Sequence, residues 1–475
     1  MNKMRQILSI CAIALSATVY GQDLSLYNLR TLPQNLQANP AHFSASNYYV
    51  AGGMLPLPSP IGAFPLNISV SNGFAFKDII QGGTTTRLNP SDYISTMPET
   101  SQLNISKQMD LLNFGFKVKE KHFFWLNYQT RADVNALYSQ NLFQFAWNGN
   151  GGADLLGDTT TISGFGVDAK MYSAIKFGWS TKLTDQLTFG FVPTLYIGHG
   201  MLSTRNTALQ LYTSEALDQL SITPILEMEA AGLPAGDILN GEEVGMNPED
   251  FIASGMGFGF DFGFNYQISD QFSAGLSVID FGFINWTGSI LKNNATPVVF
   301  EGLDASSLFS SAEGTNGGED TSSTSFVDSL LGDVTNNLTV TDSAAVFNAN
   351  APTRIYMSGT YKINEKVNTG ILLRHTIKNG KYSLAASFNA NVDVSNKISA
   401  VLAYNMRNRS YNNIGIGAAV NLGPIQFYMM MDDIIGLTQI DYAKNIDIRF
   451  GFNIRPSHNR KGSSKKVEKS EGEKK

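Results

Sequence analysis

The sequence is poor in cysteine. Its 475 residues contain one, Cys11, which lies among the first 21 residues. If those residues are removed, the mature chain has no thiol, which excludes disulfides, thiol catalysis and cysteine metal sites. Ile10, just before Cys11, is too bulky for the small residue that lipoprotein processing requires, so we expect no lipid anchor.

Charge is also scarce. Charged residues make up 16% of the chain, below the roughly 25% of an ordinary soluble protein. The net charge of -6 indicates no nucleic-acid partner, because such partners attract basic proteins. After the N-terminus there is no run of about 18 apolar residues, so a bundle of membrane helices is excluded as well.

The first 21 residues have the features of a secretory signal peptide. Lys3 and Arg5 form a basic start, an apolar run covers residues 7–17, and small or apolar residues precede Gln22. We therefore predict Sec-dependent export and cleavage near Gly21. Loss of Lys3 and Arg5 would change the net charge from -6 to -8.

What the chain does have is aromatic residues, at 11%, and 44 glycines, arranged with a period of two. In "GMGFGFDFGFNYQI", residues 255–268, one parity is almost entirely aromatic and the other is glycine, Asp261, Asn265 and Gln267. Such alternation predicts a strand with two unlike faces. It recurs in the segments 64–76, 109–118, 123–134, 170–181, 187–198, 255–268, 272–286, 354–363, 367–377, 382–393, 398–406, 411–422, 425–431 and 446–454.

Both a soluble sandwich and a membrane barrel have strands with two unlike faces. Three features favour the barrel. The segments are mostly 9 to 14 residues long, the length that crosses a bilayer, and the chain carries an export signal. The aromatic face suits lipid and the glycine and polar face suits a closed lumen. The sequence therefore predicts an all-β, transmembrane antiparallel β-barrel of about 14 strands.

An even strand number places both termini in the periplasm. The short turns "KEKH", "SDQ", "NEK" and "GP" then face the periplasm, and the long connections 77–108, 135–169, 199–254 and 287–353 form outer loops. Residues 141–147 are an alternative extra strand, and "ALQLYTSEALDQL" in 205–231 predicts a helix over the outer mouth.

The chain divides into four predicted parts. Residues 1–21 are the signal, 22–60 an N-terminal plug or periplasmic cap, 61–455 the barrel, and 456–475 a basic disordered periplasmic tail. In the second part, Leu29, Leu32 and Leu36 have helical spacing. Such a segment either lies against the periplasmic end or folds into the lumen.

Catalytic and metal-binding motifs are missing. The five histidines are scattered, and there is no H-E-x-x-H, G-x-S-x-G or P-loop. The glycines of 255–263 lie within a strand, which excludes a dinucleotide site. The acidic, Lys- and Arg-free stretch 293–353 lacks EF-hand spacing and indicates a solvated loop. We predict no enzyme activity, no cofactor and no metal.

Charged residues on the predicted lumen face are the candidate site. They suggest a polar path or a latch for the N-terminal segment, or else an interior in which charges pair with one another. Asp280 breaks the parity of its strand and predicts a bulge near the outer rim. The candidates are Arg131, Asp133, Lys176, Asp261, Arg354, Arg374 and Arg449.

Three stretches, "LYNLRTLPQNLQANPA", "GFGFDFGFNYQISDQFSAGLSVIDFGFINW" and "NIDIRFGFNI", resemble a family of Bacteroidota outer-membrane proteins of unassigned function. That family is similar to the fourteen-stranded FadL-type barrels, which move hydrophobic molecules and carry an N-terminal hatch, and to PorV, a FadL-like accessory of type IX secretion. The resemblance implies an outer-membrane barrel in contact with lipids, with Asn39, Pro40 and Ala41 in the hatch.

The resemblance leaves two functions open. One is the binding or passage of hydrophobic or small solutes. The alternative is a structural, accessory or plug component of the type IX secretion apparatus, with the translocon as partner and the basic tail as a candidate contact.

Overall fold

The computed structural model describes residues 24–43, 46–52, 66–71, 80–81, 87–88, 94–95, 97–148, 157–216, 219–240, 253–301, 339–395, 397–407, 410–438 and 443–455. The predicted signal peptide, the basic tail and most of the acidic loop lie outside these residues. No helix within them has both the length and the apolar character needed to cross a bilayer.

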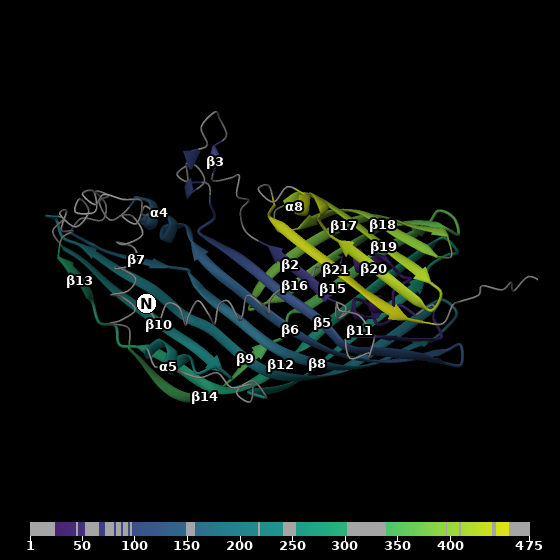
Figure 1. Ribbon diagram of the computed structural model, residues 1–475, viewed down its shortest axis with the longest axis horizontal. Helices are drawn as coiled ribbons and strands as arrows, with labels where there is room; N and C mark the ends of the chain where they lie inside the picture. The colour runs from purple at the N-terminus through teal and green to yellow at the C-terminus, as the bar shows by residue number, and fades with distance from the viewer. Residues whose placement is uncertain are drawn as a thin grey trace, which may run out of the picture.

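Fourteen antiparallel strands form a closed ring, which confirms the predicted transmembrane barrel (Figure 1). Each strand pairs with its neighbours in chain order, and the last pairs with the first, β21 with β2. The ring consists of β2 (Leu66–Ser71), β5 (Thr100–Val118), β6 (His122–Ser139), β8 (Gly166–Lys182), β9 (Leu187–Thr213), β11 (Gly255–Gln267), β12 (Phe272–Asn293), β15 (Thr353–Lys362), β16 (Val367–Lys378), β17 (Lys381–Ser395), β18 (Ile398–Arg407), β19 (Ser410–Leu422), β20 (Ile425–Met431) and β21 (Asn445–Ile454).

The aromatic face of the strands points outward. On β11, Met256 and Phe258 are 56% and 64% exposed, whereas Asp261 between the aromatic positions is fully buried. Large apolar side chains are exposed in the same way on strands around the ring. An apolar outer surface with a polar interior is the arrangement of a barrel that lies in lipid.

The first strand of the wall is divided. Of the predicted strand 64–76, residues 66–71 form β2, and the rest lies outside the described residues. A second piece, β1 (Tyr48–Ala51), comes from residues expected in the N-terminal segment. Both pieces pair with β5 on one side and β21 on the other. Together they close the ring at the same position between β5 and β21.

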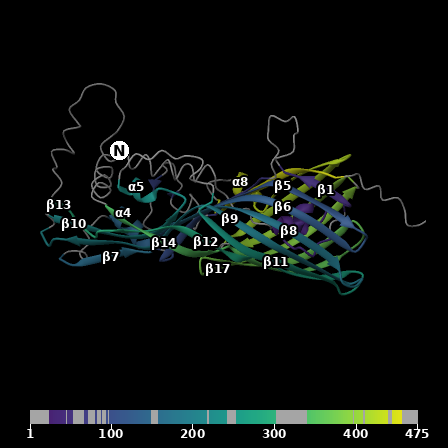
Figure 2. The ribbon, with the colours of Figure 1, turned by 90° about the horizontal axis from the view of Figure 1, so that it is seen from below.

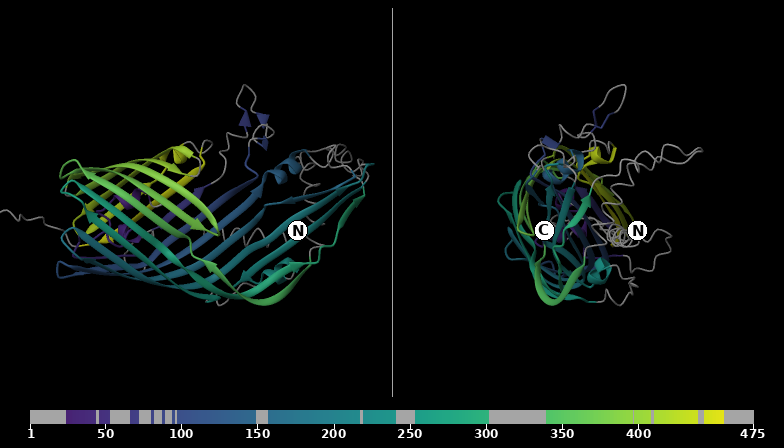
Figure 3. Two further views of the ribbon diagram at one scale, coloured as in Figure 1. Left: turned by 180° about the vertical axis from the view of Figure 1, so that it is seen from behind. Right: turned by 90° about the vertical axis from the view of Figure 1, so that its left-hand side faces the viewer.

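Several strands continue beyond the ring as an open, curved sheet, which we call the extension (Figures 2 and 3). It contains the ends of β9 and β12 together with β7 (Thr159–Ser163), β10 (Gln219–Ala231), β13 (Val298–Glu301) and β14 (Val340–Asn350). Parts of all four predicted outer loops are therefore strand. Thr, Ser, Asn and Ala fill many of these positions, so the alternation that marks the membrane strands is weak there.

The alternative of an extra strand and the prediction of a helix over the outer mouth both fail in this region. Residues 141–147 form no strand but lie in helix α4 (Gln140–Asn148), whose Leu142 amide is capped by the Ser139 hydroxyl. The predicted helix in 205–231 is instead the end of β9 and the start of β10, because ladder pairing on both sides of β9 outweighs local helix propensity. A short helix, α5 (Ala235–Asn240), and a separate pair, β3 (Ile80–Gln81) with β4 (Arg87–Leu88), complete this end.

The bulge predicted at Asp280 is present. Asp280 has φ of 58°, and the register between β11 and β12 shifts between Phe260 and Phe262. The bulge lies in the middle of β12 and not near its outer end, since the strand continues to Asn293. It marks the point where β15 stops and β14 starts as the partner of β12.

Candidate functional site

Residues 24–43, which we call the inner segment, lie within the ring of strands (Figure 1). They form helix α2 (Leu24–Asn28) and a 3₁₀ turn, η1 (Pro33–Gln37). Their apolar side chains join three separate clusters on the wall: one with β12 and β15–β17, one with β18–β20, and one with β1, β6 and β9. A segment that touches so many wall strands must occupy the bore.

The start of α2 is held by a carboxylate. The Oδ2 atom of Asp432, just after β20, accepts a hydrogen bond from the Leu24 amide at 3.2 Å, and Oδ1 accepts one from the Ser25 amide at 2.8 Å. Asp432 also lies 3.8 Å from the Arg407 guanidinium, which in turn binds Asp447. Burial, and next the nearby Asp447 carboxylate, raise the pKa of Asp432 to about 6.

Two wall glycines explain where the tripeptide Asn39–Pro40–Ala41 lies. A Cβ atom on Gly263 would be 2.1 Å from the Asn39 Oδ1 atom, and one on Gly190 would be 2.3 Å from the Pro40 carbonyl. Wall hydroxyls hold the same stretch, since Ser180 Oγ donates to the Pro40 oxygen at 2.6 Å. Glycine on the inner face thus makes the slot into which the inner segment fits.

Side-chain amides connect the inner segment to the barrel charges. Gln37 donates to Asp110 at 2.8 Å and accepts hydrogen bonds from Arg449 and Gln108, both at 2.9 Å. Gln108 continues the chain by donating to Gln129 at 2.6 Å. All these side chains are buried, so each depends on the others for hydrogen bonding.

A buried ion cluster surrounds Asp280. Its carboxylate lies 2.6 Å from both Arg131 of β6 and Lys176 of β8, and it also binds Arg354 of β15. Lys176 binds a second carboxylate, Asp261 of β11, at 2.7 Å. The cluster holds three cations and two anions and joins five strands of the ring. It lies at the level of the β12 bulge.

A second ionic contact crosses the bore nearer the end that bears the extension. Lys378, at the end of β16, lies 2.9 Å from Asp133 of β6. Asn379, in the tight turn that follows, accepts a hydrogen bond from Lys170 of β8 at 2.8 Å. The β16–β17 hairpin is thus fastened to the far wall.

The structure places the sequence-predicted residues in five surroundings. Arg131, Lys176, Asp261 and Arg354 meet around Asp280. Asp133 pairs with Lys378, Arg449 binds Gln37, and Arg374 is buried on β16. Asn39, Pro40 and Ala41 fill the glycine slot.

Sequence reasoning missed several of the central groups. Asp280 stood out as a parity break but not as the centre of an ion cluster. By simple alternation Asp110 would lie on the same outward, apolar face of β5 as Leu112. A bulge between these two residues turns Asp110 inward instead. Asp432 and Arg407 lie at or just beyond strand ends, where alternation carries no signal. Two features of the sequence could have indicated these groups: a break in the alternation within a strand, and a charged residue next to a strand end.

The inner segment and the charged residues of the inner wall are held together by hydrogen bonds and ion pairs. Among the described residues, no group of three or more His, Cys, Asp or Glu side chains is placed to hold a metal ion. What the site can do is hold a peptide segment inside a barrel and connect that segment to Asp110 of β5, to Arg449 of β21 and to Asp432.

Such a molecule is a closed, fourteen-stranded barrel of the outer-membrane type whose bore is occupied by its own N-terminal segment. The chain belongs to a family of unknown function, DUF5723, whose model matches residues 44–432. No curated protein matches the sequence.

Solved structures with a similar fold are outer-membrane channels. The toluene transporter TbuX of Ralstonia pickettii is 9% identical over 89% of this chain and 94% of its own, with a TM-score of 0.44. The toluene transporter TodX of Pseudomonas putida is 8% identical over 89% and 94%, with a TM-score of 0.41. A FadL homologue of Pseudomonas aeruginosa is 9% identical over 92% and 96%, with a TM-score of 0.38. Similarity this low carries no inference about a substrate.

Proposed function

We propose that the protein is a gated outer-membrane barrel that binds or passes a hydrophobic or small solute, and that the inner segment is its plug. One observation supports this most strongly. Among the described residues, the segment shares no strand pairing with the wall and is held by side chains, by Asp432 and by the glycine slot. It can leave without breaking the ladder that closes the barrel.

The charged residues have a role in this proposal. Arg131, Lys176, Asp261 and Arg354 surround Asp280 in one cluster on the inner wall, and Asp133 fastens the β16–β17 hairpin. Arg449 holds the plug through Gln37. Arg374, buried on β16, is proposed to line the same path.

Deletion of residues 24–43 tests the proposal. The variant and the full mature chain are reconstituted in liposomes and assayed for uptake of small sugars and of a hydrophobic dye. Removal of residues 456–475, also twenty residues, is the matched control. We expect uptake to rise about tenfold in the first deletion and to stay unchanged in the second. A folded barrel that remains impermeable without its inner segment would refute the plug role.

The extension favours a second candidate function, in which the protein is a structural or accessory component. A sheet that continues well past the ring presents a large surface to partners (Figure 2). The resemblance to PorV makes the type IX translocon the partner to look for, with the basic tail as a candidate contact. Affinity capture from native membranes tests it: recovery of a translocon subunit supports this role, and recovery of the barrel alone counts against it.

A further inference from the structure

Strand β14 forms one border of the extension (Figure 1). It is 11 residues long and pairs with β12 along one side without a bulge. Among the described residues, no strand pairs with its other side, which we call the open edge. The row of backbone groups at such an edge is a template on which another strand can pair.

Alternate residues of β14 turn their backbone groups toward the open edge. Val340 is one of them: its amide donates to Asn240 Oδ1 of α5 at 2.8 Å, and its carbonyl accepts a hydrogen bond from Asn240 Nδ2 at 3.2 Å. Since antiparallel pairing alternates along a strand, every second residue after Val340 faces the same way. These residues are Asp342, Ala344, Val346 and Asn348. No described residue forms a hydrogen bond with the backbone of these four.

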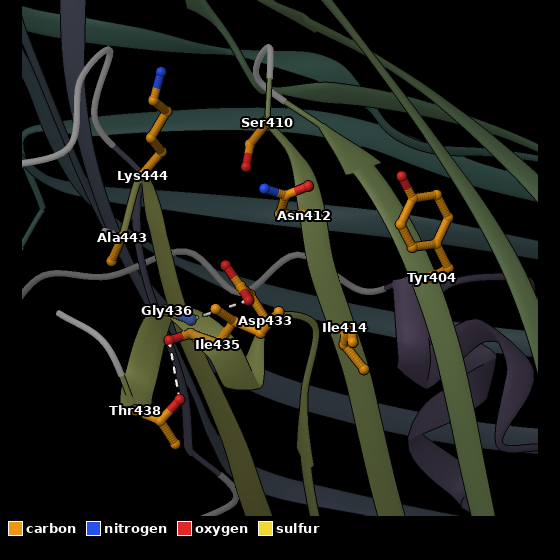
Figure 4. Close-up of a pocket in the computed structure, with 10 residues that line it drawn as sticks. All are labelled: Tyr404, Ser410, Asn412, Ile414, Asp433, Ile435, Gly436, Thr438, Ala443 and Lys444. Atoms are coloured by element: carbon orange, nitrogen blue, oxygen red, sulfur yellow. Dashed lines mark hydrogen bonds between the residues drawn. The ribbon is translucent and has the colours of Figure 1, made fainter. Parts of the chain in front are cut away.

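Elsewhere the chain covers an open strand edge itself. Strand β20 ends at Met431, short of its neighbours, and a short helix, α8 (Ile434–Thr438), packs against β19 and β21 in the gap (Figure 4). The start of α8 is fixed by Asp433, whose carboxylate accepts a hydrogen bond from the Gly436 amide at 3.1 Å. At β14 the corresponding cover is Asn240 of α5, which reaches only the first residue of the strand.

The open edge also lacks the features that keep exposed strands apart. Natural edge strands are protected by lysine, by proline or by a bulge. The sequence of β14, VTDSAAVFNAN, contains no Lys, Arg or Pro, and the Val346 side chain is 74% exposed. Nothing in β14 itself therefore opposes the addition of a further strand.

The surroundings of the open edge are acidic. Asp342 lies on β14, and Asp237 lies on α5, which packs against β14. The nearest cation of β12 along the chain, Lys292, lies 3.5 Å from Glu227. The stretch 293–353 contains eight acidic residues and no Lys or Arg. Charge complementarity therefore favours a basic partner.

A second copy of this chain does not fit the open edge. Antiparallel pairing of two β14 strands relates the copies by a twofold axis perpendicular to the sheet. Because the extension continues the wall, that axis would invert one barrel relative to the other, whereas barrels in one outer membrane share one orientation. Two edges that both carry Asp342 would also repel each other.

We propose that the open edge of β14 binds an extended, basic segment of another protein, which joins the extension as a further strand. Backbone hydrogen bonds to residues 342–348 provide affinity, and Lys or Arg side chains of the segment lie near Asp342 and Asp237. The partner approaches from the predicted outer side, to which the extension belongs. This binding site is independent of whether the bore passes a solute and of whether a translocon subunit takes part.

Fluorescence polarisation of a labelled peptide, KTVTVTVTK, with the detergent-purified full mature chain tests the proposal. The parent protein should bind this basic, strand-forming peptide saturably. The peptide KTPTVPVTK has the same charge, but its prolines remove an amide hydrogen from each edge of the peptide. The peptide ETVTVTVTE keeps the strand-forming residues and reverses the charge. We expect each of these two control peptides to bind about tenfold more weakly.

Two variants at one position test the edge itself. Ala344→Pro removes an amide hydrogen that faces the open edge and no hydrogen bond to β12, so it should weaken binding of KTVTVTVTK about tenfold. Ala344→Ser keeps the amide hydrogen and should retain binding. Heat-dependent electrophoretic migration reports whether each variant is a folded barrel.

Four results would overturn the proposal. They are no binding by the parent, equal binding of the basic and acidic peptides, undiminished binding by a folded Ala344→Pro barrel, and binding that appears only after deletion of residues 305–335. The last result would assign the open edge to the chain's own loop.

Discussion

The Nζ atom of Lys378 lies 2.9 Å from the Oδ1 atom of Asp133, and the two residues come from nearly opposite sides of the barrel. Five strands lie between β6 and β16 in one direction around the ring (β8, β9, β11, β12 and β15) and seven in the other. Only a hairpin that leans over the bore can make this contact. The ion pair therefore joins two sides of the barrel without the inner segment, and we expect it to act as a closure.

Breaking this contact should loosen the bore without unfolding the barrel. In Lys378→Met, Asp133 loses its ion-pair partner, and we expect unfolding to become easier by about 1–3 kcal/mol. Single-channel recordings should show more frequent opening than in the parent. Lys366→Met, in an exposed turn at the other end, is the control. An identical opening frequency in Lys378→Met and the parent would contradict the closure.

Asp280 should be among the most sensitive positions of the wall. Asp280→Ala removes the carboxylate that Arg131, Lys176 and Arg354 share. Loss of one partner from a buried ion pair lowers the free energy of unfolding by about 3–5 kcal/mol. Urea unfolding in lipid vesicles measures the change. Asp270→Ala, in an exposed turn, should change stability little. Equal midpoints for the two variants would show that the cluster contributes nothing to stability.

The glycine slot should tolerate no side chain. Gly263→Ala places a Cβ atom 2.1 Å from Asn39 Oδ1, so we expect the inner segment to shift, at a cost of about 1–3 kcal/mol. Limited proteolysis should then cut within residues 24–43 while the barrel stays resistant. Gly359→Ala is matched, because nothing lies within 4 Å of a Cβ atom there. Equal protection of the segment in both variants would argue against the slot.

Asp432 should make stability depend on pH. Its pKa is raised from 3.8 to about 6, so the folded chain binds this proton more tightly than the unfolded chain does. The stabilisation is complete below about pH 4 and is lost as the pH rises through 6, an effect of about 3 kcal/mol. Asp432→Asn keeps the side-chain shape and should remove this share of the pH dependence. Thermal unfolding at pH 3.5 and pH 7.5 measures it, and parallel profiles for parent and variant would disprove the assignment.

Much of the wall followed from the sequence. Segments such as 425–431 and 446–454 match β20 and β21 to within a residue, because a strand between lipid and a polar bore must alternate at every position. The extension was missed because strands without a lipid face need no such alternation. The extra residue in β5 that turns Asp110 inward was also hidden, since a bulge changes parity without changing composition.

The sequence by itself determined that this chain forms a membrane barrel with charged residues inside, since period-two patterning follows directly from having lipid on one side of each strand. Tertiary structure alone decided which charges meet. Arg131, Lys176, Asp261, Asp280 and Arg354 come from five strands spread over more than two hundred residues, and their contact depends on the curvature of the ring and one bulge. The match between Asn39–Pro40–Ala41 and Gly190 and Gly263 likewise exists only once the ring is closed around the segment.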